Sequence, residues 1–252
     1  YSVVDLAIQP IADLTYCGEA MEPELVILHG DKVLERDQDY TVTYSDNINA
    51  GTATAAIQGI GNYTGTRLVT YNIRPYDVSG LSNVLKGKDG KMYEAEYTGK
   101  AIRPTTAFRL AVQYKGENVY LYPKEGQDYS CEYENNKKVG KASIRYTFKG
   151  NYTGAVVKEF RIIPKAPKPE VKKKSNGNRL IRWKAVKSSD YYEVYRKSAK
   201  KGKYKRIAKV KRCSYEDKNV SLDKVYYYKI AACKKRGKKV YRSVAGQGER
   251  SK

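Results

Sequence analysis

Polar and apolar residues alternate with a period of two along much of the chain. Residues 39–44 alternate, residues 46–51 are rich in Asp, Asn and Gly, and residues 52–57 alternate again. A second turn-like stretch, 59–65, precedes another alternating run at 68–73. Because successive side chains of a β-strand point to opposite faces, this pattern predicts short strands with one buried face.

Further strands are predicted at 3–8 and 25–28, and His29-Gly30-Asp31 is predicted to turn the second of these into a hairpin. No stretch sustains a period of 3.6, so we expect no helix longer than a turn or two. Short strands separated by Gly, Asn and Asp turns are typical of an all-β sandwich.

The first two thirds of the chain are an internal duplication. The pentapeptide Gly-Asn-Tyr-Thr-Gly occupies 61–65 and again 150–154, which is 89 residues later. Two further pairs share this offset: Asp39-Tyr40 with Asp128-Tyr129, and Asn47…Gly51 with Asn136…Gly140. Such a fixed offset indicates a modular array. We interpret Asn62 and Asn151 as turn residues and not as glycosylation sites.

The two copies differ in length. Tyr97-Thr98-Gly99 matches Tyr16-Cys17-Gly18 at an offset of only 81, so the second copy has eight more residues before Asp128. We expect them near 103–122, in an enlarged loop or pair of strands. The boundary between the two repeats is short, and the boundary after the second repeat, 164–169, is rich in proline. These boundaries predict three domains: 1–75, 76–164 and 165–252.

The third domain has its own strand pattern. Strands are predicted at 180–183, with Trp183 pointing inward, and then at 192–196, 204–210, 225–233 and 239–245. Turns are expected at 200–203 and 234–238. This is again a sandwich, of about seven strands.

Charge is distributed very unevenly. The chain carries a net charge of +22, but residues 1–74 hold −6, residues 75–164 hold +5 and residues 165–252 hold +23. The third domain therefore accounts for the basicity, and it is where a polyanion would bind.

The residues needed for catalysis or metal binding are sparse. His29 is the sole histidine and lies in a predicted turn, and Glu132 and Glu134 fit a solvated strand face. The Asp37, Asp39 and Asp46 spacing matches no calcium loop, and no Cys/His cluster fits zinc. A bond between Cys213 and Cys233 is left open by the sequence. We expect no catalytic residue, no cofactor and no metal.

The first two domains resemble the tandem Ig-like repeats of surface and secreted proteins from Gram-positive gut bacteria. The resemblance rests on a Tyr-x-Gly entry, an Asp-Tyr pair, an Asn-x-x-x-Gly turn and the closing pentapeptide. The matching residues are Tyr16, Gly18, Tyr97 and Gly99, then Asp39-Tyr40 and Asp128-Tyr129, then Asn47, Gly51, Asn136 and Gly140, and finally 61–65 and 150–154.

The third domain resembles a bacterial fibronectin type III module. The residues that carry this resemblance are Trp183-Lys184-Ala185-Val186, Tyr192-x-Val194-Tyr195-Arg196, Gly202-x-Tyr204-x-x-Ile207, Ser214-Tyr215-x-Asp217 and Tyr226-x-x-x-Ile230-x-Ala232. It departs from the family where Leu222-Asp223-Lys224-Val225 replaces the usual Pro-Gly, although Tyr226 fits the corner tyrosine. Together the resemblances imply an all-β fold of three tandem β-sandwich domains, two Ig-like and one fibronectin type III-like.

Lysine and arginine cluster in two predicted turns of the third domain. If both turns belong to hairpins of one sheet, the clusters form one electropositive surface that attracts polyanions. A lysine-rich solubilising surface is the alternative, and the sequence leaves both open. The predicted polyanion-binding residues are Lys200, Lys201, Lys203, Lys205, Arg206, Lys234, Lys235, Arg236, Lys238 and Lys239.

We interpret the chain as a non-catalytic extracellular spacer or adhesion segment of a bacterial cell-surface protein. Its expected partners are an anionic wall polymer, an acidic glycan or a host surface protein. We expect no nucleic acid, no membrane span and a monomeric chain. The alternative is the accessory C-terminal region of a secreted cell-wall or glycan-active enzyme. In that case the catalytic domain would precede Tyr1, because the chain begins without Met or a signal peptide and looks like a fragment.

Overall fold

The structure is a computed structural model that describes residues 1–198, 202–244 and 249–250. It contains two compact units, one made of 1–81, 105–131 and 145–156 and the other of 82–104, 132–144 and 157–252. These units do not test the three predicted domain boundaries, which stay predictions. In the described part of the chain the secondary structure is strand apart from one 3₁₀ turn, and no helix there could cross a membrane.

The first repeat is a β-sandwich of a four-stranded sheet, β2-β7-β6-β5, and a three-stranded sheet, β1-β3-β4. Its elements are the 3₁₀ helix η1 (Val3–Asp5) and the strands β1 (Ala7–Ile8), β2 (Leu14–Thr15), β3 (Ile27–His29), β4 (Lys32–Val33), β5 (Tyr40–Ser45), β6 (Gly51–Gly59) and β7 (Thr66–Arg74). The predicted strand 3–8 is thus wrong in its first half. There the Ser2 hydroxyl accepts from the backbone N–H of Val4 and starts a 3₁₀ turn.

The second repeat copies this order, which confirms the duplication. Its strands are β8 (Tyr76–Asp77), β9 (Glu94–Glu96), β10 (Leu110–Tyr114), β11 (Glu117–Leu121), β12 (Tyr129–Glu134), β13 (Gly140–Phe148), β14 (Tyr152–Thr153) and β15 (Ala155–Ile163). The sheet order β12-β13-β15-β9 mirrors β2-β7-β6-β5, and β9 lies parallel to β15 as β2 lies parallel to β7. Most of the eight additional residues enlarge the hairpin β10–β11, as expected, since the segment 110–121 is longer than the matching segment 27–33.

That enlarged hairpin packs against the first repeat inside the first compact unit. Val112 and Tyr114 contact the core built from residues such as Ile57 and Tyr71, and the Tyr114 hydroxyl donates to the carbonyl of Ala20 at 2.9 Å. At Gly18, with φ at +84°, a Cβ atom would lie 2.9 Å from the Leu121 side chain. Only glycine therefore permits this close approach.

The second pentapeptide also belongs to this junction. The Asn151 side-chain oxygen accepts from the backbone N–H of Ala50 at 2.8 Å, and its amide nitrogen donates to Asn49 at 2.9 Å. The ring of Tyr152 packs edge-on against Tyr16, with 5.5 Å between centroids. Asn62, at the same place in the first pentapeptide, has an exposed side chain.

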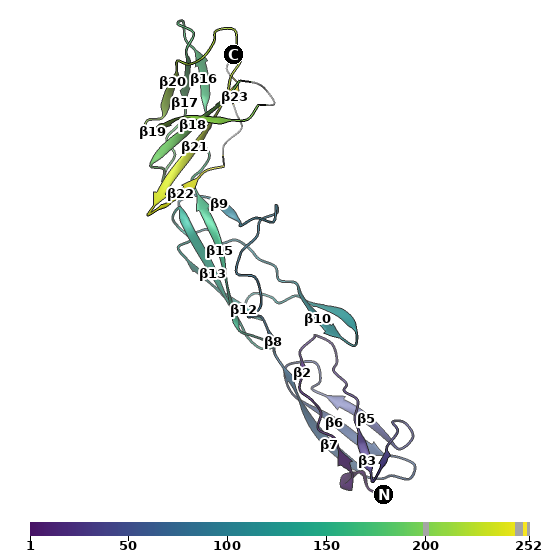
Figure 1. Ribbon diagram of the computed structural model, residues 1–252. Helices are drawn as coiled ribbons and strands as arrows, with labels where there is room; N and C mark the ends of the chain where they lie inside the picture. Colours follow the sequence, from purple (N-terminus) through teal and green to yellow (C-terminus); the bar gives the residue numbers. More distant parts are fainter. Residues whose placement is uncertain (199–201, 245–248, 251–252) are drawn as a thin grey trace. The chain divides into compact units, whose positions relative to one another are not determined.

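The strands that follow form a third sandwich, which we call the C-terminal sandwich. Its strands are β16 (Glu170–Lys173), β17 (Arg179–Arg182), β18 (Tyr191–Lys197), β19 (Lys205–Val210), β20 (Ser214–Asp217), β21 (Tyr227–Arg236), β22 (Lys239–Arg242) and β23 (Glu249–Arg250). They form the sheets β16-β17-β20 and β19-β18-β21-β22, and β23 pairs with β21 (Figure 1). The core between the sheets contains Trp183, as predicted, with Tyr192 and Ile230.

The loop before β21 forms a tyrosine corner, although residues 222–225 replace the usual Pro-Gly. The backbone N–H of Ser221 donates to the Tyr226 hydroxyl at 3.0 Å, as in the tyrosine corner of sandwich domains. The fold class predicted from the sequence, an all-β chain of β-sandwiches, is confirmed. The predicted turn 234–238 is too long, because β21 continues to Arg236 and only Gly237 and Lys238 turn.

The two copies of the pentapeptide provide a matched pair for testing the junction. In Asn151→Ala the Ala50 amide loses its acceptor, so we expect its hydrogen exchange to accelerate about five- to tenfold, the value of one hydrogen bond. Asn62→Ala should leave Ala50 unchanged. Amide exchange followed by NMR measures the rate. Equal protection of the Ala50 amide in wild type and in Asn151→Ala would contradict the claim that the Asn151 side chain holds the two repeats together.

Candidate functional site

A carboxylate is buried on the outer face of the sheet β19-β18-β21-β22, away from the core. Glu193 is 1% exposed, although it lies between the core residues Tyr192 and Val194 and so points the other way. It accepts from Arg206 at 3.1 Å, from Arg242 at 3.0 Å and from the Tyr195 hydroxyl at 2.6 Å. A buried charge is stable only when paired in this way.

A β-bulge brings Arg206 to this carboxylate. The register of β18 and β19 shifts between Val194 and Tyr195, so that Ala208 lies opposite Val194 while Arg206 lies opposite Tyr195. The additional residue, Ile207, packs with the core. Without the bulge, Ile207 would lie opposite Tyr195, and Arg206 would point to the wrong face.

The two arginines determine how Glu193 ionises. Burial alone would raise the pKa of Glu193, but the hydrogen bonds from Arg242 and Tyr195 and the two guanidinium charges outweigh it. The net result is a pKa below the usual range. Burial and the neighbouring carboxylate raise the pKa of the Tyr195 hydroxyl to about 12. Glu193 is therefore an anion and Tyr195 a neutral donor at neutral pH.

Three lysines lie over tyrosine rings on the same face. The Lys209 Nζ is 4.1 Å from the Tyr191 centroid, and the Lys229 Nζ is 4.8 Å from the Tyr204 centroid. Lys197 lies between two rings, 4.8 Å from Tyr204 and 5.2 Å from Tyr227. Such cation–π contacts hold the ammonium groups in place while leaving them charged.

We call this surface the basic tyrosine face. It comprises the cations Lys197, Arg206, Lys209, Lys229 and Arg242, the rings Tyr191, Tyr195, Tyr204 and Tyr227, and the carboxylate Glu193. The charges of these residues sum to +4; Arg206 and Arg242 pair with Glu193, whereas the three lysines lie over tyrosine rings. The geometry is suited to binding extended anions, because its charges are many, close together and held by neighbours.

The structure separates the polyanion-binding residues predicted from the sequence. Both hairpins belong to one sheet, as assumed, but their turns lie at opposite ends of it. Tyr191 pairs with Cys233, so the turn at Gly237 lies beyond the start of β18, whereas Lys205 pairs with Arg196 near the end of β18. The described members of the two clusters therefore lie at opposite ends of the sheet and do not form the single surface that we expected.

The predicted residues have different surroundings. Lys200 and Lys201 lie outside the described residues. Lys234 donates to Asp190 at 2.6 Å, and the Arg236 guanidinium donates to the carbonyl of Val139 at 3.2 Å. The exposed residues are Lys203, Lys205, Arg206, Lys235, Arg236, Lys238 and Lys239. Of the predicted residues, Arg206 is part of the basic tyrosine face.

Lys197, Lys209, Lys229 and Arg242 are not among the polyanion-binding residues predicted from the sequence. Runs of consecutive lysines do not mark them, because a strand face is built from alternate positions. The signal was available in Tyr191, Glu193, Tyr195 and Lys197, which are spaced by two along β18.

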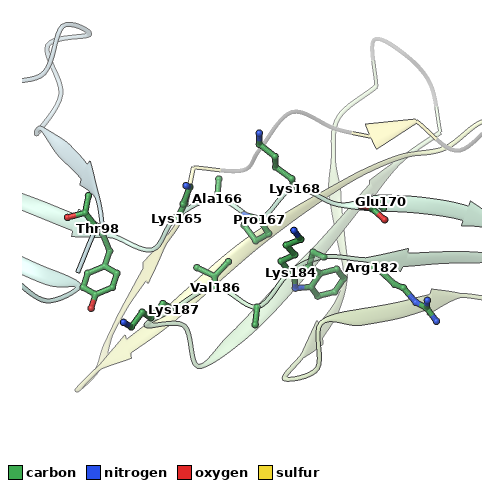
Figure 2. A pocket seen from close by; sticks show the side chains of 13 residues that line it. Thr98, Lys165, Ala166, Pro167, Lys168, Glu170, Arg182, Lys184, Val186 and Lys187 are labelled. Carbon is green, nitrogen blue, oxygen red and sulfur yellow. The ribbon is translucent and has the colours of Figure 1, made fainter. Parts of the chain in front are cut away.

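A separate cavity of about 760 Å³ lies beside the start of the C-terminal sandwich. Residues 165–168 line it on one side and 182–187 on the other, and Tyr97 and Thr98 also contribute. Figure 2 shows Pro167 and Val186 between lysines, with Lys187 toward one end and Arg182 toward the other.

The remaining candidates have structural surroundings. His29 Nδ1 lies 3.2 Å from the Tyr63 hydroxyl, and the two rings meet edge-on. The four cysteines are free thiols, so Cys213 and Cys233 are not bonded to each other. Burial raises the pKa of the Cys233 thiol to about 11.

No family model and no curated protein matches the chain. Solved structures do show similarity. A Fn3-like protein from Clostridium thermocellum is 22% identical and matches 35% of this chain and 92% of its own, with a TM-score of 0.32. Domains A168–A170 of titin are 12% identical over 98% of this chain and 96% of theirs, with a TM-score of 0.29. The FN1–FN3 domains of chicken CNTN1 are 12% identical over 97% and 96%, with a TM-score of 0.32.

These overall scores are low, and the fold assignment rests on the strand order and the tyrosine corner described above. On that basis the C-terminal sandwich has a fold of the Fn3/Ig-like kind.

Substitution of the buried carboxylate should change how the stability of the C-terminal sandwich depends on pH. Because the folded-state pKa of Glu193 is lowered, its stabilising effect is present above the unfolded-state pKa of about 4.3 and is lost as pH falls through the folded value. Glu193→Gln should cost about 2 kcal/mol at pH 7 and lose less stability than wild type below about pH 4.

Urea unfolding monitored by the fluorescence of Trp183 measures the stability of the C-terminal sandwich, because Trp183 is the one tryptophan of the chain and lies in the core of that sandwich. Asp223→Asn, an exposed carboxylate of the same sandwich, is the control. If Glu193→Gln has wild-type stability at pH 7, the ion pairs have no stabilising role.

Proposed function

We propose that the chain is a non-catalytic spacer and adhesion segment of a bacterial cell-surface protein, and that the basic tyrosine face binds a polyanion. The polyanion is an anionic wall polymer or an acidic glycan. The observation that carries the proposal is that five cations share a single sheet face, where two arginines pair with the buried Glu193 and three lysines lie over tyrosine rings.

The positions of the lysines support binding and not only solubility. A solubilising lysine extends freely into water, whereas Lys209 and Lys229 rest over tyrosine rings. Their side chains have already lost part of their rotamer freedom, so less entropy is lost when an anion binds. Binding releases the counterions of the polyanion, which makes the affinity fall with salt.

The packed connections support the role of a spacer. In the first compact unit, Asn151 and the β10–β11 hairpin hold the second repeat against the first. In the second unit, Pro164, Pro167 and Pro169 are buried, so the proline-rich segment is part of the packed structure. Segments joined in this way transmit position better than flexible linkers.

A charge-neutral triple variant tests the face. Lys197→Gln, Lys209→Gln and Lys229→Gln together should weaken binding of the intact chain to teichoic acid or heparin about a hundredfold, since each lysine contributes about 1 kcal/mol next to an anionic surface. The dependence of affinity on salt should become shallower. Titration calorimetry at several salt concentrations measures both.

Lys203→Gln, Lys238→Gln and Lys239→Gln form the matched control, because they remove the same charge from the two lysine clusters that were predicted from the sequence. An equal loss of affinity in both triple variants would show that net charge, and not the face, determines binding.

A further inference from the structure

The cavity of Figure 2 forms because two paired segments are forced apart. Glu170 and Arg182 are the last paired residues of β16 and β17 on this side. Pro169 precedes Glu170 and Pro167 lies two residues further back, and neither has an N–H to extend the ladder. On the other side of β17 the pairing with β20 continues for one more residue, where the backbone N–H of Trp183 donates to the carbonyl of Cys213 at 3.1 Å. A groove opens between the diverging segments.

The groove combines an apolar base with a cationic rim. Pro167 is buried and Val186 is half-buried, so both present fixed apolar surface. The rim contains Lys165, Lys168, Lys184 and Lys187 with Arg182, against one carboxylate, that of Glu170. The net charge around the groove is +4, and a volume of 760 Å³ is in the range of pockets that enclose small ligands.

One buried donor at this site has no acceptor. Trp183 lines the groove and is 7% exposed, yet its indole N–H finds no hydrogen-bond partner in the described part of the structure. Its ring packs edge-on against Tyr192, with 5.3 Å between centroids, which fixes its orientation. Buried unsatisfied donors are rare in native proteins, and one beside a groove calls for a ligand oxygen or a bridging water.

We propose that this groove binds a short acidic saccharide, with a carboxylate facing Lys168 and Lys184. The sugar ring would lie against Pro167 and Val186, and one of its oxygens would satisfy the Trp183 indole directly or through water. The site is independent of the basic tyrosine face, since it uses different residues and a different sheet.

Three features favour an acidic saccharide over other anions. The rim attracts negative charge, which a neutral sugar lacks. The apolar base matches the C–H face of a sugar ring and offers nothing to a bare phosphate chain. The buried indole N–H of Trp183, which lines the groove, has no acceptor among the described residues, and saccharides carry hydroxyl oxygens next to their carboxylates.

The fluorescence of the single tryptophan reports directly on the groove. Titration of the intact chain with trigalacturonate should give a saturable change in Trp183 emission at a ratio of one to one. A neutral galactose trisaccharide should give a much weaker response. Lys168→Gln with Lys184→Gln should raise the dissociation constant at least tenfold, the effect of losing a hydrogen bond to a charged group.

Two controls separate this site from general basicity and from the proposed function. Lys172→Gln with Lys173→Gln removes the same charge from exposed positions of β16 and should leave the affinity unchanged. The variant of Lys197, Lys209 and Lys229 should also leave it unchanged, so either proposal can fail without the other.

The proposal is overturned if trigalacturonate gives no saturable change, or if the neutral trisaccharide binds equally well. Tighter binding of an oligomeric glycerol phosphate would overturn the saccharide assignment. Equal losses in the two double variants would show that the groove has no specific role. Calorimetry with Trp183→Phe, with circular dichroism to check folding, tests the indole separately. Unchanged affinity in a folded variant would remove Trp183 from the site.

Discussion

Each strand sends alternate side chains to opposite faces of its sheet, and in the C-terminal sandwich this constraint produces both the core and the charged surface. In β18, Tyr192 and Val194 pack inward, while Tyr191, Glu193 and Tyr195 point outward. If the pairing register of β18 shifted by one residue, its core side chains would move to the outer face and its outer side chains to the core. The bulge at Ile207 adds one residue to β19 opposite β18, and it keeps Arg206 on the outer face.

The outer face is stable because its charges and rings are mutually dependent. Glu193 would be costly to bury alone, and Arg206 and Arg242 compensate for its desolvation. The lysines would repel one another on a bare sheet, but tyrosine rings separate them and attract each ammonium group. A surface of this kind presents positive charge at defined positions, which a disordered lysine tail cannot do.

The duplicated pentapeptide shows how one sequence acquires two roles. In both repeats its backbone pairs with the segment that begins the repeat: the Tyr1 amino group donates to the Asn62 carbonyl, and the Tyr76 N–H donates to that of Asn151. The side chains differ, because that of Asn151 contacts the first repeat whereas that of Asn62 is exposed. The larger β10–β11 hairpin adds the apolar contacts that complete the junction.

Much of this protein was determined by local sequence. Period-two alternation and Gly/Asn turns predicted most strands, the offset of 89 predicted the matching sheets, and Tyr226 predicted the corner, because each depends on neighbours close in the chain or on repeated residues. The 3₁₀ turn at Val3 was missed because a serine cap competes with strand pairing there. The relative positions of the two lysine clusters were not predicted, because runs of lysine do not reveal at which end of a sheet they lie.

Only the tertiary structure determined which cations contact Glu193. Arg206 and Arg242 reach Glu193 from strands that are 13 and 49 residues away in sequence, through a register that includes a bulge. The groove beside Trp183 likewise requires two strands to part at a proline. Both sites depend on long-range pairing, whose energy comes from contacts between residues far apart in the chain, and no local pattern specifies them.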